Sequence, residues 1–310
     1  MTCGVPQGSI LGPILFLIYI NDLNYVLNKF CNIMFADDTN LFIAGRSIEE
    51  LEQIINEELQ NISKWFQANL LSLNIKKTSY IIFRNNNTKK LNITIKIQNI
   101  AIERQNETKF LGVILSSNLK WTLHIDVVLA KISKTIGIIA KVRHIIPQTL
   151  TKMLYLTLVE PYINYCNIVW GSSARTTDLE KIFKVQKKYC RLITFSGYKD
   201  HSKRLFKDLN LMNVFDIYKC QLSCYMFKLV NFQLPDIYRF SYNDEIHSHD
   251  TRHKSDIHKA YSRTKSRQST VRFQGPFLWN NLPIKIKNSP SANVFKKRVK
   301  YYFTHDCNDN

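Results

Sequence analysis

The sequence predicts an α+β fold in its first third and a mainly helical remainder. Two apolar, β-prone runs, 32–36 and 39–43, flank a pair of acidic residues and indicate a β-hairpin. A third β-prone run, 80–83, follows an amphipathic helical stretch, so strands and a covering helix alternate along the chain. Beyond residue 113, apolar residues recur at helical spacing, which predicts helices through most of the remaining sequence.

The first predicted element is a helix that begins at Pro13, after a glycine-rich loop. Proline suits the first turn of a helix because its missing N–H would have no partner there. Residues 14–20 are apolar nearly all round, which predicts a buried helix, and the run is far shorter than the ~20 residues of a membrane span. In the preceding loop, Gly8 and Gly12 would let backbone amides approach an anion at the helix N-terminus.

Asp37 and Asp38 stand at the turn of the predicted hairpin. Two ionised neighbours at a tight turn repel each other, so packing alone gives no reason for the pair. A divalent cation would relieve the repulsion, and Mg²⁺ in polymerase sites is held by one or two carboxylates together with substrate phosphates. Aspartate is also common at turns for local hydrogen-bonding reasons, which leaves an ordinary turn as the alternative.

An amphipathic helix is predicted after the hairpin. Ser47 and Glu50 have the spacing of a capping box, and apolar residues from Ile48 to Phe66 recur at helical intervals. This helix would cover a sheet and lead through residues 69–78 to the strand at 80–83. The order strand, helix, strand is typical of a two-layer α+β domain.

Three further helices are predicted at 121–139, 150–159 and 178–193. The first has an apolar stripe from Trp121 to Ile139 interleaved with lysines, and the third is rich in basic residues. Lysines beside an apolar packing face suit sequence-independent contacts to phosphates, although an ordinary solvated face is the plainer interpretation. Five basic residues on these helices are predicted to contact nucleic acid: Lys131, Lys134, Lys187, Lys188 and Arg191.

The last region, 241–310, is polar and basic. Its histidine- and arginine-rich part, 241–272, is predicted to be a flexible segment that contacts nucleic acid. Zinc binding is disfavoured because the histidines lack a paired Cys-x-x-Cys, and we expect Cys220 and Cys224 to be small core residues on a helix. Aromatic residues within 275–283 are predicted to anchor a turn before a final helix at 292–303.

Four motifs, in order, resemble a reverse transcriptase. They are the loop and helix from Gly4 to Leu23, the sequence Phe35-Ala36-Asp37-Asp38, the block 65–78 and the block 109–113. The chain is most similar to the C-terminal palm and thumb portion of a non-LTR (LINE-type) retrotransposon polymerase, of the jockey or CR1-like kind. The resemblance implies a partial palm in 1–115, an antiparallel sheet with covering helices, then a helical thumb or connection region in 116–240 and a basic C-terminal region in 241–310.

The resemblance also implies roles for individual residues. Asp37 and Asp38 would be catalytic and would bind the metal, Mg²⁺ or Mn²⁺. Lys77 would assist the leaving pyrophosphate, with a solvated surface lysine as the equally weighted alternative. The nucleotide-binding loop would consist of Pro6, Gln7, Gly8 and Ser9, and the primer grip of Phe110, Leu111 and Gly112.

The implied function is RNA-directed DNA polymerisation by two-metal nucleotidyl transfer to a primer 3′-hydroxyl. The partners would be an RNA template, a DNA primer and deoxynucleoside triphosphates. The family's site has a third aspartate on a strand before the glycine–proline loop, which begins here at Gly4, and Asp22 comes too late in the order to supply it. We therefore expect weak or no activity from this chain alone, and the alternative function is a non-catalytic nucleic-acid-binding remnant of a decayed or domesticated element.

Composition agrees with a polyanionic partner. The 310 residues are 45% hydrophobic, enough for real cores, and carry a formal net charge of +19. Seven cysteines without the spacing of a disulfide framework fit a reducing compartment. We expect a nuclear or cytoplasmic protein, neither secreted nor membrane-spanning, and the sequence leaves its oligomeric state open.

Overall fold

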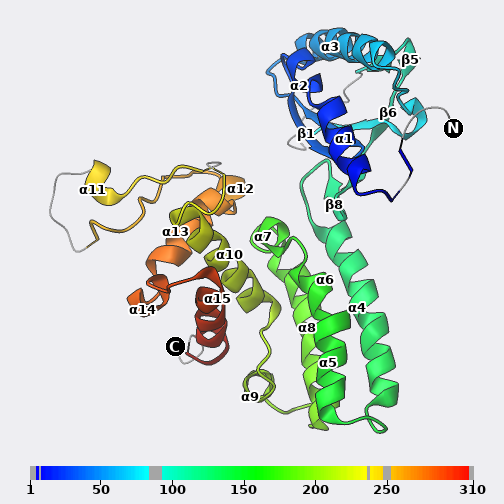
Figure 1. Cartoon of the computed structure of the whole chain (residues 1–310). Helices are drawn as coiled ribbons and strands as arrows, with labels where there is room; N and C mark the ends of the chain where they lie inside the picture. Colours follow the sequence, from blue (N-terminus) through cyan, green and yellow to red (C-terminus); the bar gives the residue numbers. More distant parts are fainter. Residues whose placement is uncertain (1–4, 7, 84–92, 236–237, 247–252, 307–310) are drawn as a thin grey trace. The chain divides into compact units, whose positions relative to one another are not determined.

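The structure is a computed structural model that describes residues 5–6, 8–83, 93–235, 238–246 and 253–306. The chain divides into two compact units, 1–108 and 109–310, which are described separately (Figure 1). This division falls a few residues before the predicted boundary at 115. The boundaries at 115 and 240 stay predictions.

The first unit combines helices with short strands. Its elements are α1 (Leu11–Ile20), α2 (Leu23–Val26), β1 (Cys31–Phe35), β2 (Asp38–Phe42), α3 (Ile48–Ala68), the 3₁₀ turn η1 (Ile75–Lys77), β3 (Ser79–Ile81), β4 (Lys96–Ile97), β5 (Ile100–Ala101) and β6 (Glu103–Gln105). Strand β7 (Glu107–Phe110) spans the division between the units. The predicted α+β class is confirmed.

The described strands pair two by two instead of forming one sheet. β1 and β2 form the predicted antiparallel hairpin, with Phe35 opposite Asp38, and β4 pairs antiparallel with β5. β3 pairs with β6 in parallel, which differs from the antiparallel sheet of the prediction. A parallel pair requires a long connection, and the chain between β3 and β6 contains the β4–β5 hairpin.

Helix α3 supplies one wall of the first unit's core (Figure 1). The predicted cap is present, because Ser47 Oγ accepts a hydrogen bond from the Glu50 N–H at 3.4 Å. Leu59, Ile62 and Trp65 are buried with Ile95 and Ile97 in one apolar cluster. The helix therefore packs as its periodicity predicts.

Helix α1 forms as predicted but is not buried. It begins at Leu11 and holds Pro13 in its first turn. Ile20 is its one buried residue, whereas Leu17 and Ile18 are 63% and 68% exposed. The prediction of a buried helix is wrong for this structure, because the core gathers around α2, α3 and β4 and α1 reaches it only through Phe16 and Ile20.

The second unit is mainly helical. Its elements are β8 (Val113–Ser116), α4 (Thr122–Val142), α5 (Gln148–Leu158), α6 (Glu160–Asn164), α7 (Asn167–Trp170), α8 (Thr176–Thr194), α9 (Ser202–Asp208), α10 (Val214–Val230), α11 (Asn243–Ile246), α12 (Lys265–Gln268), α13 (Val271–Asn280), α14 (Ile284–Lys287), α15 (Ala292–Tyr301) and the π-helical turn η2 (Tyr302–Asp306). Helices α5, α8 and α15 confirm three predicted helices.

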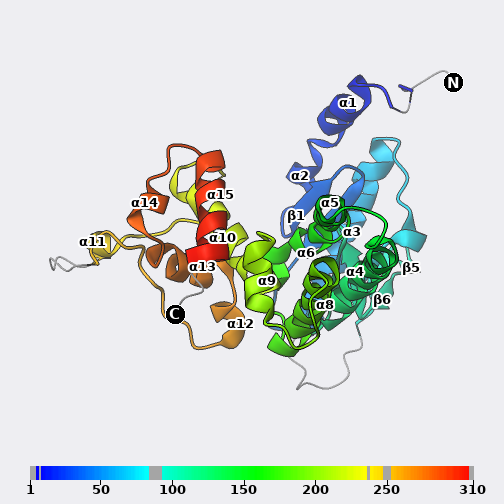
Figure 2. The ribbon, with the colours of Figure 1, turned by 90° about the horizontal axis from the view of Figure 1, so that it is seen from below.

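The long helices α4, α5 and α8 lie side by side (Figure 1; Figure 2). The predicted apolar stripe of α4 forms the centre of this bundle, with Ile125, Ile132 and Ile139 fully buried. Residues at this spacing fall on one face of a helix, so a single stripe meets both neighbours. The sequence predicted this element correctly.

A second apolar cluster in this unit joins α10, α13 and α15 (Figure 2). Phe295 stacks on Phe227 at 4.4 Å and on Trp279 at 6.0 Å between ring centroids. Trp279 confirms the predicted aromatic anchor, although it lies in helix α13 rather than in a turn. Cys220 is buried and Cys224 half-buried in this cluster, as expected of small core residues.

The described part of segment 241–272 is anchored, which differs from the predicted flexible segment. Ile257 is buried and forms a β-bridge with Tyr242. The Asn280 side chain holds the Ile257 backbone on both sides, accepting from its N–H at 3.1 Å and donating to its carbonyl at 2.9 Å. His247 and His249 lie outside the described residues.

No helix among the described residues has the length and apolar character needed to cross a bilayer.

Replacing Asn280 with alanine should lower the unfolding free energy of the chain by about 1–3 kcal/mol, because two backbone groups of Ile257 lose their partner. Asn281→Ala is the matched control, because Asn281 is exposed, and should change stability by less than about 0.5 kcal/mol. Urea denaturation followed by circular dichroism measures both. Equal stabilities of the two variants would contradict the anchoring role.

Candidate active site

The β1–β2 turn carries the two adjacent aspartates. Ala36 and Asp37 connect the strands, and Asp38 opens β2 opposite Phe35. Ala36 has φ +53°, a left-handed conformation that costs an L-residue roughly 1–2 kcal/mol. Five residue pairs between the strands hold this strained turn in place.

Both carboxylates are exposed at this turn. Neither forms a hydrogen bond or ion pair with another described residue, so their oxygens are open to a cation. Within the described ranges, no group of three or more His, Cys, Asp or Glu side chains comes together. The donor set of two carboxylates fits a hydrated divalent cation, whose remaining positions water and phosphate oxygens would fill.

The loop before α1 is a tight turn. Ser9 N–H donates to the Pro6 carbonyl at 3.2 Å, and Gly8 has φ +86°. Ser9 Oγ accepts from the Gly12 N–H at 3.1 Å, which satisfies one free amide at the start of the helix. Gln7 lies outside the described residues, as does Gly4, so the nucleotide contact of this loop stays a prediction.

Lys77 ends the 3₁₀ turn η1. Its backbone N–H donates to Asn74 Oδ1 at 3.2 Å, and its side chain is exposed. No hydrogen bond or ion pair between Lys77 and the paired aspartates occurs in the described part of the chain. The role of Lys77 at the leaving pyrophosphate therefore stays a prediction.

The β7–β8 turn contains two of the three predicted primer-grip residues. Leu111 has φ +44° and Gly112 φ +84°, and positive φ at both central positions is the mark of a type I′ hairpin turn. Phe110 precedes them half-buried, and Gly112 is exposed. The turn is therefore open to a ligand at Gly112.

The basic residues predicted to contact nucleic acid differ in their surroundings. Lys131, Lys134 and Lys188 are exposed. Lys187 is half-buried, with its Nζ 4.5 Å from the centroid of the Phe183 ring. Arg191 donates to the Asp200 carbonyl at 3.1 Å and therefore also holds the loop after α8.

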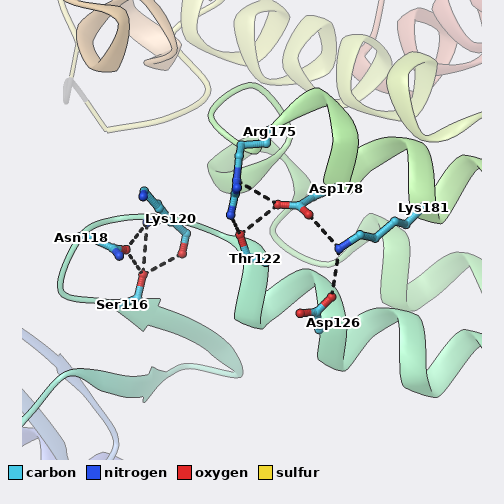
Figure 3. A network of polar contacts seen from close by, with 8 residues as sticks. All are labelled: Ser116, Asn118, Lys120, Thr122, Asp126, Arg175, Asp178 and Lys181. Atoms are coloured by element: carbon cyan, nitrogen blue, oxygen red, sulfur yellow. Dashed lines mark hydrogen bonds and ion pairs between the residues drawn. The ribbon is translucent and has the colours of Figure 1, made fainter.

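A polar network that the sequence did not predict joins the start of α4 to the start of α8 (Figure 3). Asp178, which is buried, accepts from Thr122 Oγ1 at 2.9 Å and from Lys181 Nζ at 3.0 Å. Arg175 Nε lies 3.5 Å from the same carboxylate, and Lys181 also lies 3.6 Å from Asp126. Burial raises the pKa of Asp178, but hydrogen bonds from Lys181 and Thr122 outweigh it and leave the pKa below its ordinary value.

The connection between β8 and α4 belongs to the same region (Figure 3). Ser116 Oγ donates to the Lys120 carbonyl at 2.7 Å and accepts from the Lys120 N–H at 3.1 Å. Asn118 Oδ1 also accepts from the Lys120 N–H, at 3.0 Å. These contacts and the Asp178 network fix the start of α4. An acid in the first turn of a helix with a lysine three residues later was the available signal.

His124 belongs to the predicted apolar stripe of α4, and its burial confirms that placement. It is buried between the rings of Trp121 and Trp170, at centroid distances of 6.5 and 5.7 Å. Its Nδ1 accepts from the Ile114 N–H at 3.4 Å, and Nε2 has no partner among the described atoms. Burial lowers the pKa of His124, and the charge of Lys131 adds to this effect.

Residues 1–115 match the family model described as reverse transcriptase (RNA-dependent DNA polymerase). This region is therefore similar to reverse transcriptases, as the motifs predicted. No solved structure gives a significant match to the chain.

The chain is also similar to polymerases of particular mobile elements. It is 25% identical over 224 residues to the probable RNA-directed DNA polymerase from transposon X-element of Drosophila melanogaster, covering 70% of this chain and 24% of that protein. It is 28% identical to the RNA-directed DNA polymerase from mobile element jockey of Drosophila funebris, covering 69% and 24%. It is 25% identical to the Pol polyprotein from type-1 retrotransposable element R1 of Bradysia coprophila, covering 56% and 18%.

These relatives confirm the predicted resemblance to reverse transcriptases of the non-LTR (LINE-type) retrotransposon kind. The chain spans about a quarter of the length of the X-element and jockey proteins. The family generally uses a divalent metal ion, for which the paired aspartates are the candidate ligands.

Replacing Asp178 with alanine should lower the unfolding free energy by about 1–3 kcal/mol, because the Thr122 hydroxyl and the Lys181 ammonium lose a buried acceptor. Asp126→Ala removes the same charge from an exposed position and should cost less than about 0.5 kcal/mol. Guanidinium unfolding compares the two variants. A larger loss for Asp126→Ala would refute the ranking of the two carboxylates.

His124 should make stability depend on pH. Its pKa is lowered in the folded state, so the unfolded chain takes up the proton first, near the ordinary histidine value of about 6.5. Stability is therefore fully present above that pH and decreases as pH falls below it. Asp178, with a lowered pKa, acts in the same direction, but only in the ordinary carboxyl range near pH 4 and below.

His124→Gln keeps a neutral acceptor and should show a smaller loss of stability than the wild-type chain between about pH 7.5 and about pH 5.5. Urea unfolding at the two pH values measures the difference. An identical loss in both proteins would show that another group causes the pH dependence.

Proposed function

We propose that this chain takes part in RNA-directed DNA polymerisation, the transfer of deoxynucleotides to a primer 3′-hydroxyl on an RNA template. The observation that carries the proposal is the β1–β2 turn, which presents Asp37 and Asp38 exposed and unpaired among the described residues. Such a turn brings two anionic oxygen donors to a strained point of the backbone, where functional residues often lie. The family match over residues 1–115 supports the same function.

Asp37 would be the main ligand of a divalent cation, Mg²⁺ or Mn²⁺, with Asp38 beside it. A bound cation would neutralise phosphate charge and favour ionisation of the attacking hydroxyl. The chain's own residues would bind and orient the substrate. Backbone amides of the loop around Gly8 would face nucleotide phosphates, and the exposed ammonium of Lys77 would stabilise charge on the leaving pyrophosphate.

The second unit would hold the primer–template duplex. Lys131, Lys134 and Lys188 are exposed and suited to phosphate contacts that do not depend on base sequence. Lys187 and Arg191 would add charge beside them while also contributing to folding. The turn at Leu111 and Gly112, which is exposed at Gly112, would contact the primer strand, with the half-buried Phe110 behind it.

A second function is a non-catalytic nucleic-acid-binding protein, retained from a retrotransposon polymerase. The observation that favours it is the pair of carboxylates without a third acidic ligand beside them in the described ranges. Few ligands hold Mg²⁺ weakly. The formal net charge of +19 would still attract RNA or DNA. For either function, we place the protein in the nucleus or cytoplasm.

Primer extension on an RNA template with Mg²⁺ tests the first function. Asp37→Asn should reduce any extension at least tenfold, because it removes a metal ligand, and should leave salt-sensitive binding to an RNA–DNA hybrid within about twofold of wild type. Asp22→Asn is the matched control, because Asp22 is also exposed and the charge change is the same.

Extension by the Asp37→Asn variant at the wild-type rate would contradict the catalytic role of this turn. Hybrid binding by all variants, with no extension by any, would support the non-catalytic function.

A further inference from the structure

The turn between β7 and β8 has a left-handed backbone at Leu111, a conformation that leucine does not favour. Leu111 adopts φ +44°, which costs a non-glycine residue roughly 1–2 kcal/mol, whereas Gly112 adopts φ +84° freely. Left-handed residues of this kind persist when surrounding contacts determine them, and they often mark functional positions. The contacts that hold Leu111 are therefore informative.

Tyr165, at the end of α6, contacts both residues of the turn. Its hydroxyl donates a hydrogen bond to the Leu111 carbonyl at 2.5 Å. Its ring lies against Gly112, where an added Cβ would come within 3.2 Å of Tyr165 Cε1. Tyr165 thus fixes the carbonyl of Leu111 and packs its ring against Gly112.

Tyr165 is itself held by buried structure. Its N–H donates to the Pro161 carbonyl at 2.9 Å, and its carbonyl accepts from Trp170 Nε1 at 3.0 Å. Trp170 is fully buried, and Cys166 between them has a left-handed backbone at φ +50°. The phenol therefore extends toward the turn from a fixed backbone.

The far side of the turn is attached to the same helices. Val113 is buried in the α4–α8 apolar cluster, and the Ile114 N–H donates to His124 beside Trp170. Gly112 remains exposed between these two attachments. The turn is thus fixed from both sides and has an open backbone at its tip.

We propose that Tyr165 positions the β7–β8 turn so that the Leu111–Gly112 backbone meets the sugar–phosphate backbone at the 3′ end of a primer strand. The proposal rests on the function proposed above. Tyr165 acts through the turn rather than on the reacting atoms, and it makes the turn part of the helical unit that holds the duplex.

Tyr165→Phe tests this role, because it removes the hydroxyl and keeps the ring against Gly112. Tyr162→Phe is the matched control, since Tyr162 is also exposed and its hydroxyl has no hydrogen bond among the described residues. Tyr165 is itself about half exposed, so neither variant removes a core side chain.

The first measurement is amide hydrogen exchange of the full chain without nucleic acid. Tyr165→Phe should raise the exchange rate of the Ile114 amide at least threefold, because the turn loses one attachment, and Tyr162→Phe should not. Unchanged exchange in Tyr165→Phe would overturn the positioning role.

The second measurement compares binding to two RNA–DNA hybrids of equal length, one blunt and one with a recessed DNA 3′ end. The wild type and Tyr162→Phe should bind the recessed end at least threefold more tightly. Tyr165→Phe should lose this preference and keep its affinity for the blunt hybrid and its melting temperature. A role limited to folding would lower both affinities and the melting temperature together, which would overturn the proposal.

The two measurements also separate this proposal from the function it rests on. Faster exchange in Tyr165→Phe, together with no end preference in the wild type, would support the attachment of the turn by Tyr165 but refute the primer contact. An end preference that Tyr165→Phe retains would support the primer contact and overturn the role of Tyr165.

Discussion

The buried face of α4 is the constraint on which the second unit depends. Ile125, Ile132 and Ile139 fill the centre between α5 and α8, so the helix has one orientation in which its apolar stripe is covered. The same orientation of α4 fixes the position of the contacts at its first turn. The Asp178 network joins α8 to the first turn of α4, and His124 joins the same turn to β8. Apolar packing thus determines where the β7–β8 turn is attached.

Both turns that carry proposed functions contain a non-glycine residue with a left-handed backbone. Ala36 precedes the paired aspartates, and Leu111 precedes the exposed glycine of the β7–β8 turn. Each is held by its surroundings, Ala36 by the pairing of β1 with β2 and Leu111 by the Tyr165 hydrogen bond. A left-handed backbone at a non-glycine residue persists only where surrounding contacts stabilise it by more than the strain costs. The conformation of each turn therefore depends on the stability of its own unit.

The sequence predicted elements whose cause is local. The hairpin at 31–42, the cap at Ser47 and the stripe of α4 follow from alternation, capping chemistry and helical periodicity, and each is present. Other features depend on which distant segments of the chain meet. These are the exposure of α1, the parallel pairing of β3 with β6 and the contact of Tyr165 with Leu111. Local spacing has no information about such partners. Motifs could therefore suggest candidate site residues, but they could not predict that Tyr165 contacts Leu111.

We propose that Asp37 and Asp38 together form a cation site. Titration with Mn²⁺, followed by electron paramagnetic resonance of the free ion, tests it without requiring activity. We predict weak binding that Asp37→Asn and Asp38→Asn each reduce at least fivefold and Asp22→Asn leaves unchanged, because one carboxylate fewer removes both charge and a ligand. Equal Mn²⁺ binding by the wild type and all three variants would contradict the claim.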